Sequence, residues 1–137
     1  MSISNQAVAL DQITRDSIAQ ELEHFSSAPA RFLEAWKRGV RLAGPQFFGM
    51  GSPHADLRGE AQSKWDLCPK LDLIDRAIGV MSSGEKVFLA ALTSFYNAED
   101  GGELLKRVRV QGLADFGGLN LERRAVIAAL ILNYTGW

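Results

Sequence analysis

The chain has little of what disulfide-based and many catalytic sites require. Of its 137 residues, one is cysteine and two are histidine. A single thiol cannot form an intramolecular disulfide, so nothing points to an oxidising compartment. No apolar run approaches the roughly 20 residues of a membrane-spanning helix, and Met1–Gln6 lack the basic and apolar regions of a secretory signal. We therefore expect a soluble, cytoplasmic protein with no membrane contact.

An excess of charge of one sign is also missing. Fifteen Lys and Arg oppose 16 Asp and Glu, for a formal net charge of −1, so no long-range field favours nucleic acid or an anionic membrane. Apolar residues make up 47% and charged residues 23%, which is an ordinary globular balance. The length suits one domain with a stable core, and we expect a single helical domain over residues 1–137.

Catalytic and cofactor motifs are absent as well. The sequence has no G-x-S-x-G elbow, no H-E-x-x-H, no C-x-x-C and no glycine-rich phosphate loop. Cys68 and His54 would make a nucleophile–base pair only if the fold joined them, and packing of Cys68 as a small apolar residue is the favoured interpretation. We predict no catalytic residue, no metal site and no cofactor.

Apolar residues recur three and four positions apart along most of the chain, which is the helical period, and no stretch alternates as a strand would. Helices are expected to begin at Pro29, after a cap at Ser27 or Ala28, and at caps formed by Ser82 and Asn120. The expected helices cover about 5–25 with a break near 15–16, 29–43, 69–81, 83–96, 103–110 and 120 onward, with a turn at 97–102.

The last of these helices contains the block Ala125–Leu132, which is apolar on every face. A helix of this kind is usually buried centrally. The sequence therefore predicts an all-α domain of five or six helices around a buried C-terminal helix. It also predicts a long irregular loop at about 44–64, where glycines and prolines interrupt any period.

This loop is the first candidate site. It places Phe47, Phe48 and Met50 on a segment expected at the surface, where apolar clusters often bind a partner. A homodimer with these residues in the contact is one interpretation; the other is that the two rings fold back and fill the core. The polar residues of the candidate contact are Gln46, His54, Asp56 and Arg58.

A basic cluster is the second candidate site. Two short turns would bring five cations into one region, where they could contact phosphates. Neighbouring carboxylates cancel much of their charge, so a solvated polar face is favoured over nucleic-acid binding. The cations are Lys106, Arg107, Arg109, Arg123 and Arg124.

Residues 85–124 resemble an EF-hand helix–loop–helix. Asn97, Glu99 and Gly102 stand where the loop has its first ligand, its third position and its turn glycine, and 118–124 is similar to a loop end with its exiting helix. The resemblance implies a helix–loop–helix shape and not calcium binding. The fifth position is Gly101, and the twelfth is Val108 where the family has a bidentate Glu.

Taken together, these patterns favour a small interaction module that binds another protein or itself and has no catalytic activity. One alternative is a nucleic-acid-associated protein that uses the Lys/Arg cluster. Another is a ligand-binding protein or enzyme with a pocket beside the 44–64 loop.

The lack of oxygen ligands makes calcium binding a direct test of this sequence. Because calcium takes six to eight oxygens, we expect titration calorimetry to show no binding at micromolar concentrations. Micromolar heats that saturate at one ion per chain would contradict this prediction.

Overall fold

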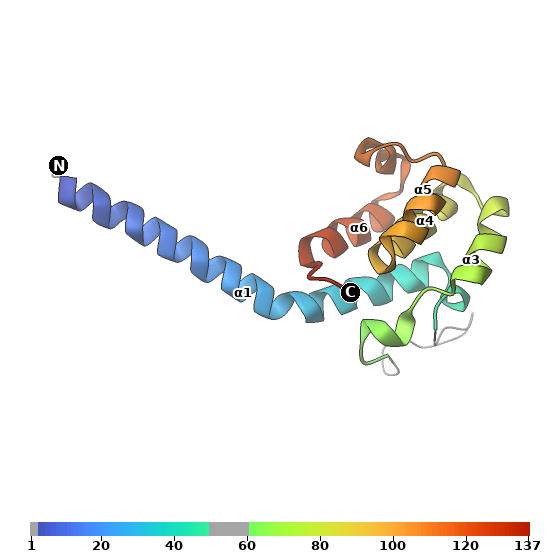
Figure 1. The fold of residues 1–137 in the computed structure, drawn as a ribbon, viewed down its shortest axis with the longest axis horizontal. Helices are drawn as coiled ribbons and strands as arrows, with labels where there is room; N and C mark the ends of the chain where they lie inside the picture. The colour runs from blue at the N-terminus through green and yellow to red at the C-terminus, as the bar shows by residue number, and fades with distance from the viewer. Residues whose placement is uncertain (1–2, 50–60) are drawn as a thin grey trace.

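One helix, much longer than any other described helix, dominates the structure. In the computed structural model, α1 (Ile3–Ala43) has 41 residues, which at 1.5 Å per residue is about 60 Å. Figure 1 shows its first half extending away from a body formed by the other helices, with the C-terminus beside its second half. The structure describes residues 3–49 and 61–137, and the side chains of these residues from Asp11 onward.

The body consists of short helices that follow one another closely. After α1 come the 3-10 helices η1 (Pro45–Phe47) and η2 (Lys64–Leu67), with residues 50–60 between them outside the described part. The remaining elements are α3 (Leu71–Ala77), η3 (Ile78–Val80), α4 (Ser83–Tyr96), α5 (Ala98–Arg107), η4 (Leu113–Gly118) and α6 (Leu121–Asn133).

The predicted all-α class is confirmed. Residues 3–49 and 61–137 contain five α-helices and no strand, apart from one isolated bridge between Phe48 and Pro69. Within the same ranges, none of the helices combines the length and the apolar character needed to cross a membrane.

The predicted boundaries within α1 are wrong. The helix continues without a break at residues 15–16 and passes through Pro29, where a new helix was expected to begin. Pro29 has no N–H to donate to the carbonyl of Phe25, but Phe25 is exposed, so water can take this place. Just before the proline, the hydroxyls of Ser26 and Ser27 donate to the carbonyl of Glu23.

The core of the body lies between the second half of α1 and α4. Trp36, at the centre of this half of α1, is fully buried, and its indole N–H donates to the carbonyl of Leu67 over 2.9 Å. From the other side, α4 presents an unbroken buried run from Phe88 to Thr93. The central helix is therefore α4, whereas the sequence placed α6 there.

One face of α6 packs on α1 and another is exposed. Val126, Ile127 and Leu130 are buried, but Ile131, which belongs to the same block that was expected to be buried, is 57% exposed. An apolar character on every face therefore does not mark this helix as the centre of the fold.

Local capping interactions set the start of three helices. The Ser82 hydroxyl accepts from the Glu85 N–H, and Asn120 accepts from the Arg123 N–H over 3.0 Å, as predicted. Asn97 likewise accepts from the Asp100 N–H, so α5 starts at Ala98 where a turn was expected. A Cβ on Gly101 would lie 2.2 Å from Ser94 Cα, so α4 and α5 require glycine there.

Replacing Leu130 with alanine tests the packing of α6. Leu130 is fully buried, and we expect Leu130→Ala to lower the free energy of unfolding by about 2–5 kcal/mol in urea denaturation. The matched control is Ile131→Ala on the same helix, which should cost less than about 1 kcal/mol because Ile131 is exposed. Equal losses for the two variants would show that α6 packs differently.

Candidate interaction surface

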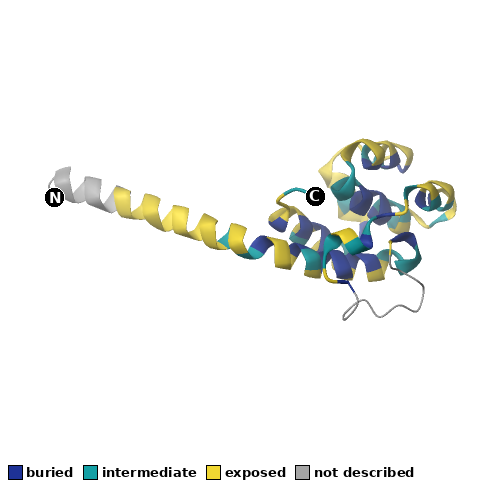
Figure 2. Ribbon diagram, turned by 60° about the horizontal axis from the view of Figure 1, so that its bottom comes forward, coloured by how far each residue is buried: buried dark blue, intermediate teal, exposed yellow. Residues whose placement is uncertain are grey.

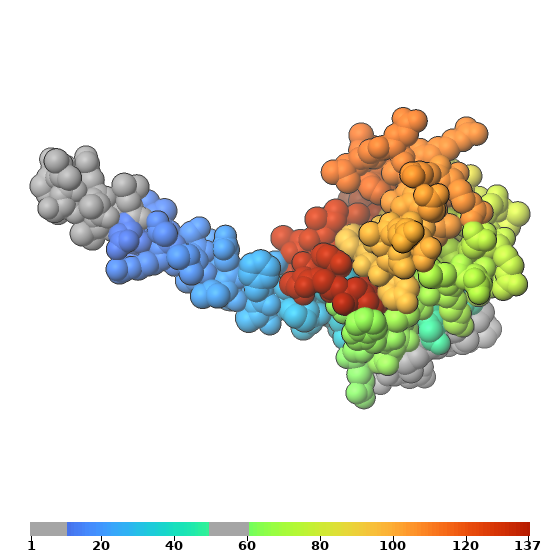
Figure 3. Space-filling model, viewed as in Figure 1, coloured from blue at the N-terminus to red at the C-terminus, as the bar shows by residue number. Residues whose placement is uncertain are grey.

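The N-terminal part of α1 projects into solvent. We call residues 11–25 of α1 the arm; every residue from 11 to 23 is exposed. In Figure 2 this stretch is almost uniformly yellow, and Figure 3 shows it standing clear of the body. A helix without tertiary contacts has marginal stability in water unless another surface packs on its apolar face.

The arm has such an apolar face. Ile18, Leu22 and Phe25 are spaced by four and three residues, so they share one side of the helix, and they are 52%, 66% and 57% exposed. We call these three residues the arm stripe. Seven and eleven positions beyond Phe25, on the same side, Phe32 and Trp36 are buried in the body. One stripe thus runs along α1, covered in its second half and uncovered in its first.

The base of the arm is attached to α6. A ring nitrogen of His24, Nε2, lies 2.8 Å from the carbonyl oxygen of Leu132, and the His24 ring packs edge-on against Phe25 at 5.6 Å between centroids. The hydrogen bond joins residues 108 positions apart. It therefore sets where the arm leaves the body.

Charge divides α1 into two halves. The arm has four carboxylates and one arginine, a formal charge of −3, whereas residues 26–43 have four cations and one carboxylate, a formal charge of +3. The arginine of the arm pairs with Asp11 over 3.0 Å. The charged residues are Asp11, Arg15, Asp16, Glu21, Glu23, Arg31, Glu34, Lys37, Arg38 and Arg41.

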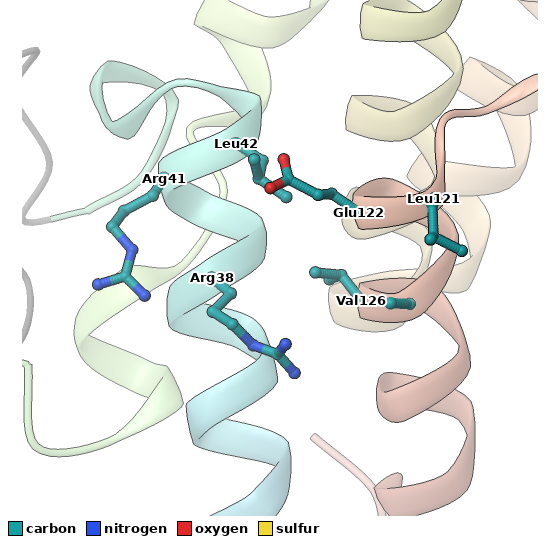
Figure 4. Close-up of a pocket in the computed structure, with 7 residues that line it drawn as sticks. Arg38, Arg41, Leu42, Leu121, Glu122 and Val126 are labelled. Carbon is teal, nitrogen blue, oxygen red and sulfur yellow. The ribbon is translucent and has the colours of Figure 1, made fainter.

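A groove lies between the basic half of α1 and the start of α6. It encloses about 350 Å³, and its lining is mostly apolar. Figure 4 shows Leu42 and Val126 on its facing walls, with Arg38 between the two helices and Arg41 on the outer side of α1. Among the described residues, neither arginine has an ion-pair partner. The lining residues are Arg38, Arg41, Leu42, Leu121, Glu122, Ala125 and Val126.

The groove continues along α6 as a second exposed apolar stripe. Leu121, Ala125, Ala128 and Leu132 are spaced by four, three and four residues, so they share one side of α6, and all four are exposed. We call them the α6 stripe. Leu121 is 82% exposed and Leu132 is 65% exposed. The two alanines leave room for the close approach of another helix.

The Phe-rich loop does not form the exposed cluster that was expected. Phe47 and Phe48 are buried, and the Phe48 ring packs edge-on against Trp36 at 5.8 Å between centroids. The bridge to Pro69 and the Lys70 N–H, which donates to the carbonyl of Phe47, hold this segment in the core. These rings are therefore not available to a partner.

The remaining residues of the loop site divide into two groups. Gln46 is half-buried at the edge of the body. Met50, His54, Asp56 and Arg58 lie outside the described residues. The Cys68–His54 pair therefore has no observed geometry. Burial raises the pKa of the Cys68 thiol, which donates a hydrogen bond to the carbonyl of Trp65 over 3.3 Å.

A cavity of about 420 Å³ lies beside the end of the loop, between η2 and α1. Lys64 lines it, but its ammonium group already contacts its own chain: it donates to the carbonyl of Gly136 and lies 5.5 Å and 5.3 Å from the ring centres of Phe32 and Trp137. Burial lowers the pKa of Lys64. The charged group that would orient a ligand there is therefore engaged.

The basic cluster is used mostly within the chain. Arg107 pairs with Asp75, Lys106 pairs with Glu103 over 3.2 Å, and Arg123 lies 5.9 Å from the centre of the Phe88 ring. Arg124 donates to the carbonyls of Leu119 and Gly117. Arg109, in a left-handed conformation, is exposed. The five cations thus do not form one open phosphate-binding surface.

The segment that resembles an EF-hand includes α4, α5 and the start of α6. The positions that would form the ion-binding loop, from Asn97 onward, are the N-cap and the body of α5. No group of three or more potential metal ligands occurs within residues 11–49 and 61–137.

Comparisons with protein families, curated proteins and solved structures found no match for this chain. The arm and the α6 stripe therefore rest on the sequence and the geometry alone. Two signals in the sequence pointed to them: the reversal of charge along α1 and an α6 that is apolar on more than one face. A helical period shows that a face exists but not what covers it.

Paired aspartate substitutions distinguish core rings from surface rings. We expect Phe47→Asp with Phe48→Asp to abolish cooperative thermal unfolding, because both charges would be buried without partners. The matched pair Leu22→Asp with Phe25→Asp should leave the helical circular dichroism and a cooperative melt in place, since both arm residues are exposed. A folded first variant would place the phenylalanines at the surface.

Proposed function

We propose that the protein is a helical interaction module whose binding element is the arm of α1. The observation that supports this most directly is the uncovered arm stripe, Ile18, Leu22 and Phe25, on a helix that extends beyond its own body. Apolar residues at helical spacing on one face are the anchors by which a helix docks into a groove or against another helix.

The arm supports this proposal better than the other sites do. The phenylalanines of the loop are in the core, the basic cluster is largely paired, and the cavity beside η2 contains a lysine engaged by its own chain. Burying one large apolar side chain contributes about 1.5–3 kcal/mol, so covering the three residues of the arm stripe offsets a substantial part of the cost of association.

The acidic flanks of the arm indicate the chemistry of the partner. With a formal charge of −3 beside the stripe, the arm favours a surface that is apolar at its centre and basic at its edges. The same charge disfavours nucleic acid and anionic lipid as partners of this element.

Site-specific photo-cross-linking in the native host tests this function. A benzoylphenylalanine at position 22 should cross-link to the partner, because Leu22 is at the centre of the stripe. The same group at Gln20, which lies on the opposite side of the helix, is the control and should give little product. Equal yields at the two positions, or no product at either, would contradict the proposal. The mass of the adduct identifies the partner.

A further inference from the structure

Two apolar stripes of the described chain are exposed, the α6 stripe and the arm stripe, and each of the three residues of the arm stripe is more than half exposed. The arm stripe has a spacing of four and three residues, and the α6 stripe has a spacing of four, three and four. Two such stripes on neighbouring helices can interdigitate, because both follow the helical period. We infer that the partner of the arm is a second copy of this chain, and that the arm of each copy lies in the groove and along the α6 stripe of the other.

This inference rests on the proposed function and names its partner. Charge supports it. The arm has a formal charge of −3, and the α1 half beside the groove has a formal charge of +3. The groove itself presents Arg38 and Arg41 against one carboxylate, Glu122. Pairing of two arms with each other would bring together two segments of charge −3, so the basic half of α1 is the better site.

The direction of the helices allows both contacts to form at once. His24 of α1 lies near Leu132 of α6, and Leu42 lies near Leu121, so α6 runs antiparallel to α1. An arm along α6 and parallel to it is therefore antiparallel to the α1 of the other copy.

A dimer in which each arm binds the groove of the other copy also has a larger interface area than a single arm–groove contact. Specific interfaces bury about 1,200–2,000 Å² in total, more than one short helix face provides. A two-fold arrangement counts every arm–groove contact twice, which is the usual property of a closed dimer. It also accounts for an α6 that is apolar on more than one face, since one side packs on its own α1 and another receives the arm.

Charge reversal on the two sides tests the inference. Analytical ultracentrifugation of the full-length protein at 1–100 µM should show a dimer. Glu21→Lys with Glu23→Lys, and separately Arg38→Glu with Arg41→Glu, should each weaken dimerisation at least tenfold. The four substitutions combined should restore it, because the charges are again opposite. The control pair Lys70→Glu with Arg76→Glu gives the same change in net charge on exposed residues of another surface and should leave the dimer intact.

The outcomes separate this inference from the function on which it rests. A folded wild type that remains monomeric up to 100 µM overturns the dimer, as does a failure of the combined variant to recover while its circular dichroism is unchanged. If position 22 then cross-links to a different protein, the arm is still an interaction element, but its partner is that protein and not a second copy of this chain. A dimer that persists with Leu22→Asp and Phe25→Asp overturns both proposals. A position 22 cross-link within one monomeric chain would show that the arm folds back on its own α6, and would overturn the exchange.

Discussion

The position of Trp36 is the constraint on which the body depends. Its ring is buried beside Phe48, 5.8 Å away, and Trp137, 4.8 Å away between centroids, so it joins α1 to the loop and to the C-terminal tail. The hydrogen bond from its indole to Leu67 adds η2 to the same centre. A buried indole N–H needs an acceptor, and this requirement holds the segment after residue 60 against α1.

This aromatic centre is close to one end of the molecule, and the asymmetry follows from it. The helices of the body gather around the second half of α1, and residues 11–23 of the arm are all exposed. α1 is thus both the central support of the core and a projecting element. The division coincides with the change of charge along the helix, so the buried half and the free half differ in electrostatic character as well as in packing.

The parts of the fold that depend on neighbours in sequence could be predicted. The all-α class, the caps at Ser82 and Asn120 and the burial of Leu130 follow from periodicity and from side chains that hydrogen-bond nearby backbone. Whether a given segment is buried or exposed could not be predicted in this way. The burial of Phe48 depends on Trp36, and the glycine at 101 is explained by the backbone of Ser94. The candidate surface was missed for the same reason: the sequence predicted a helix at about 5–25 but not which of its faces is exposed, and it placed the apolar α6 at the centre of the domain.

Pro29 gives the arm a property that neither half of α1 would have alone. Because Pro29 has no N–H, one backbone hydrogen bond of the helix is missing at the point where the exposed half of α1 meets the buried half. Kinks in helices concentrate at such residues, but here the hydrogen bond between His24 and Leu132 ties the arm to α6 only five residues earlier. The direction of the arm therefore depends on one contact with α6 as well as on the helix itself, and loss of that contact would leave the weakened turn at Pro29 as the place where α1 bends.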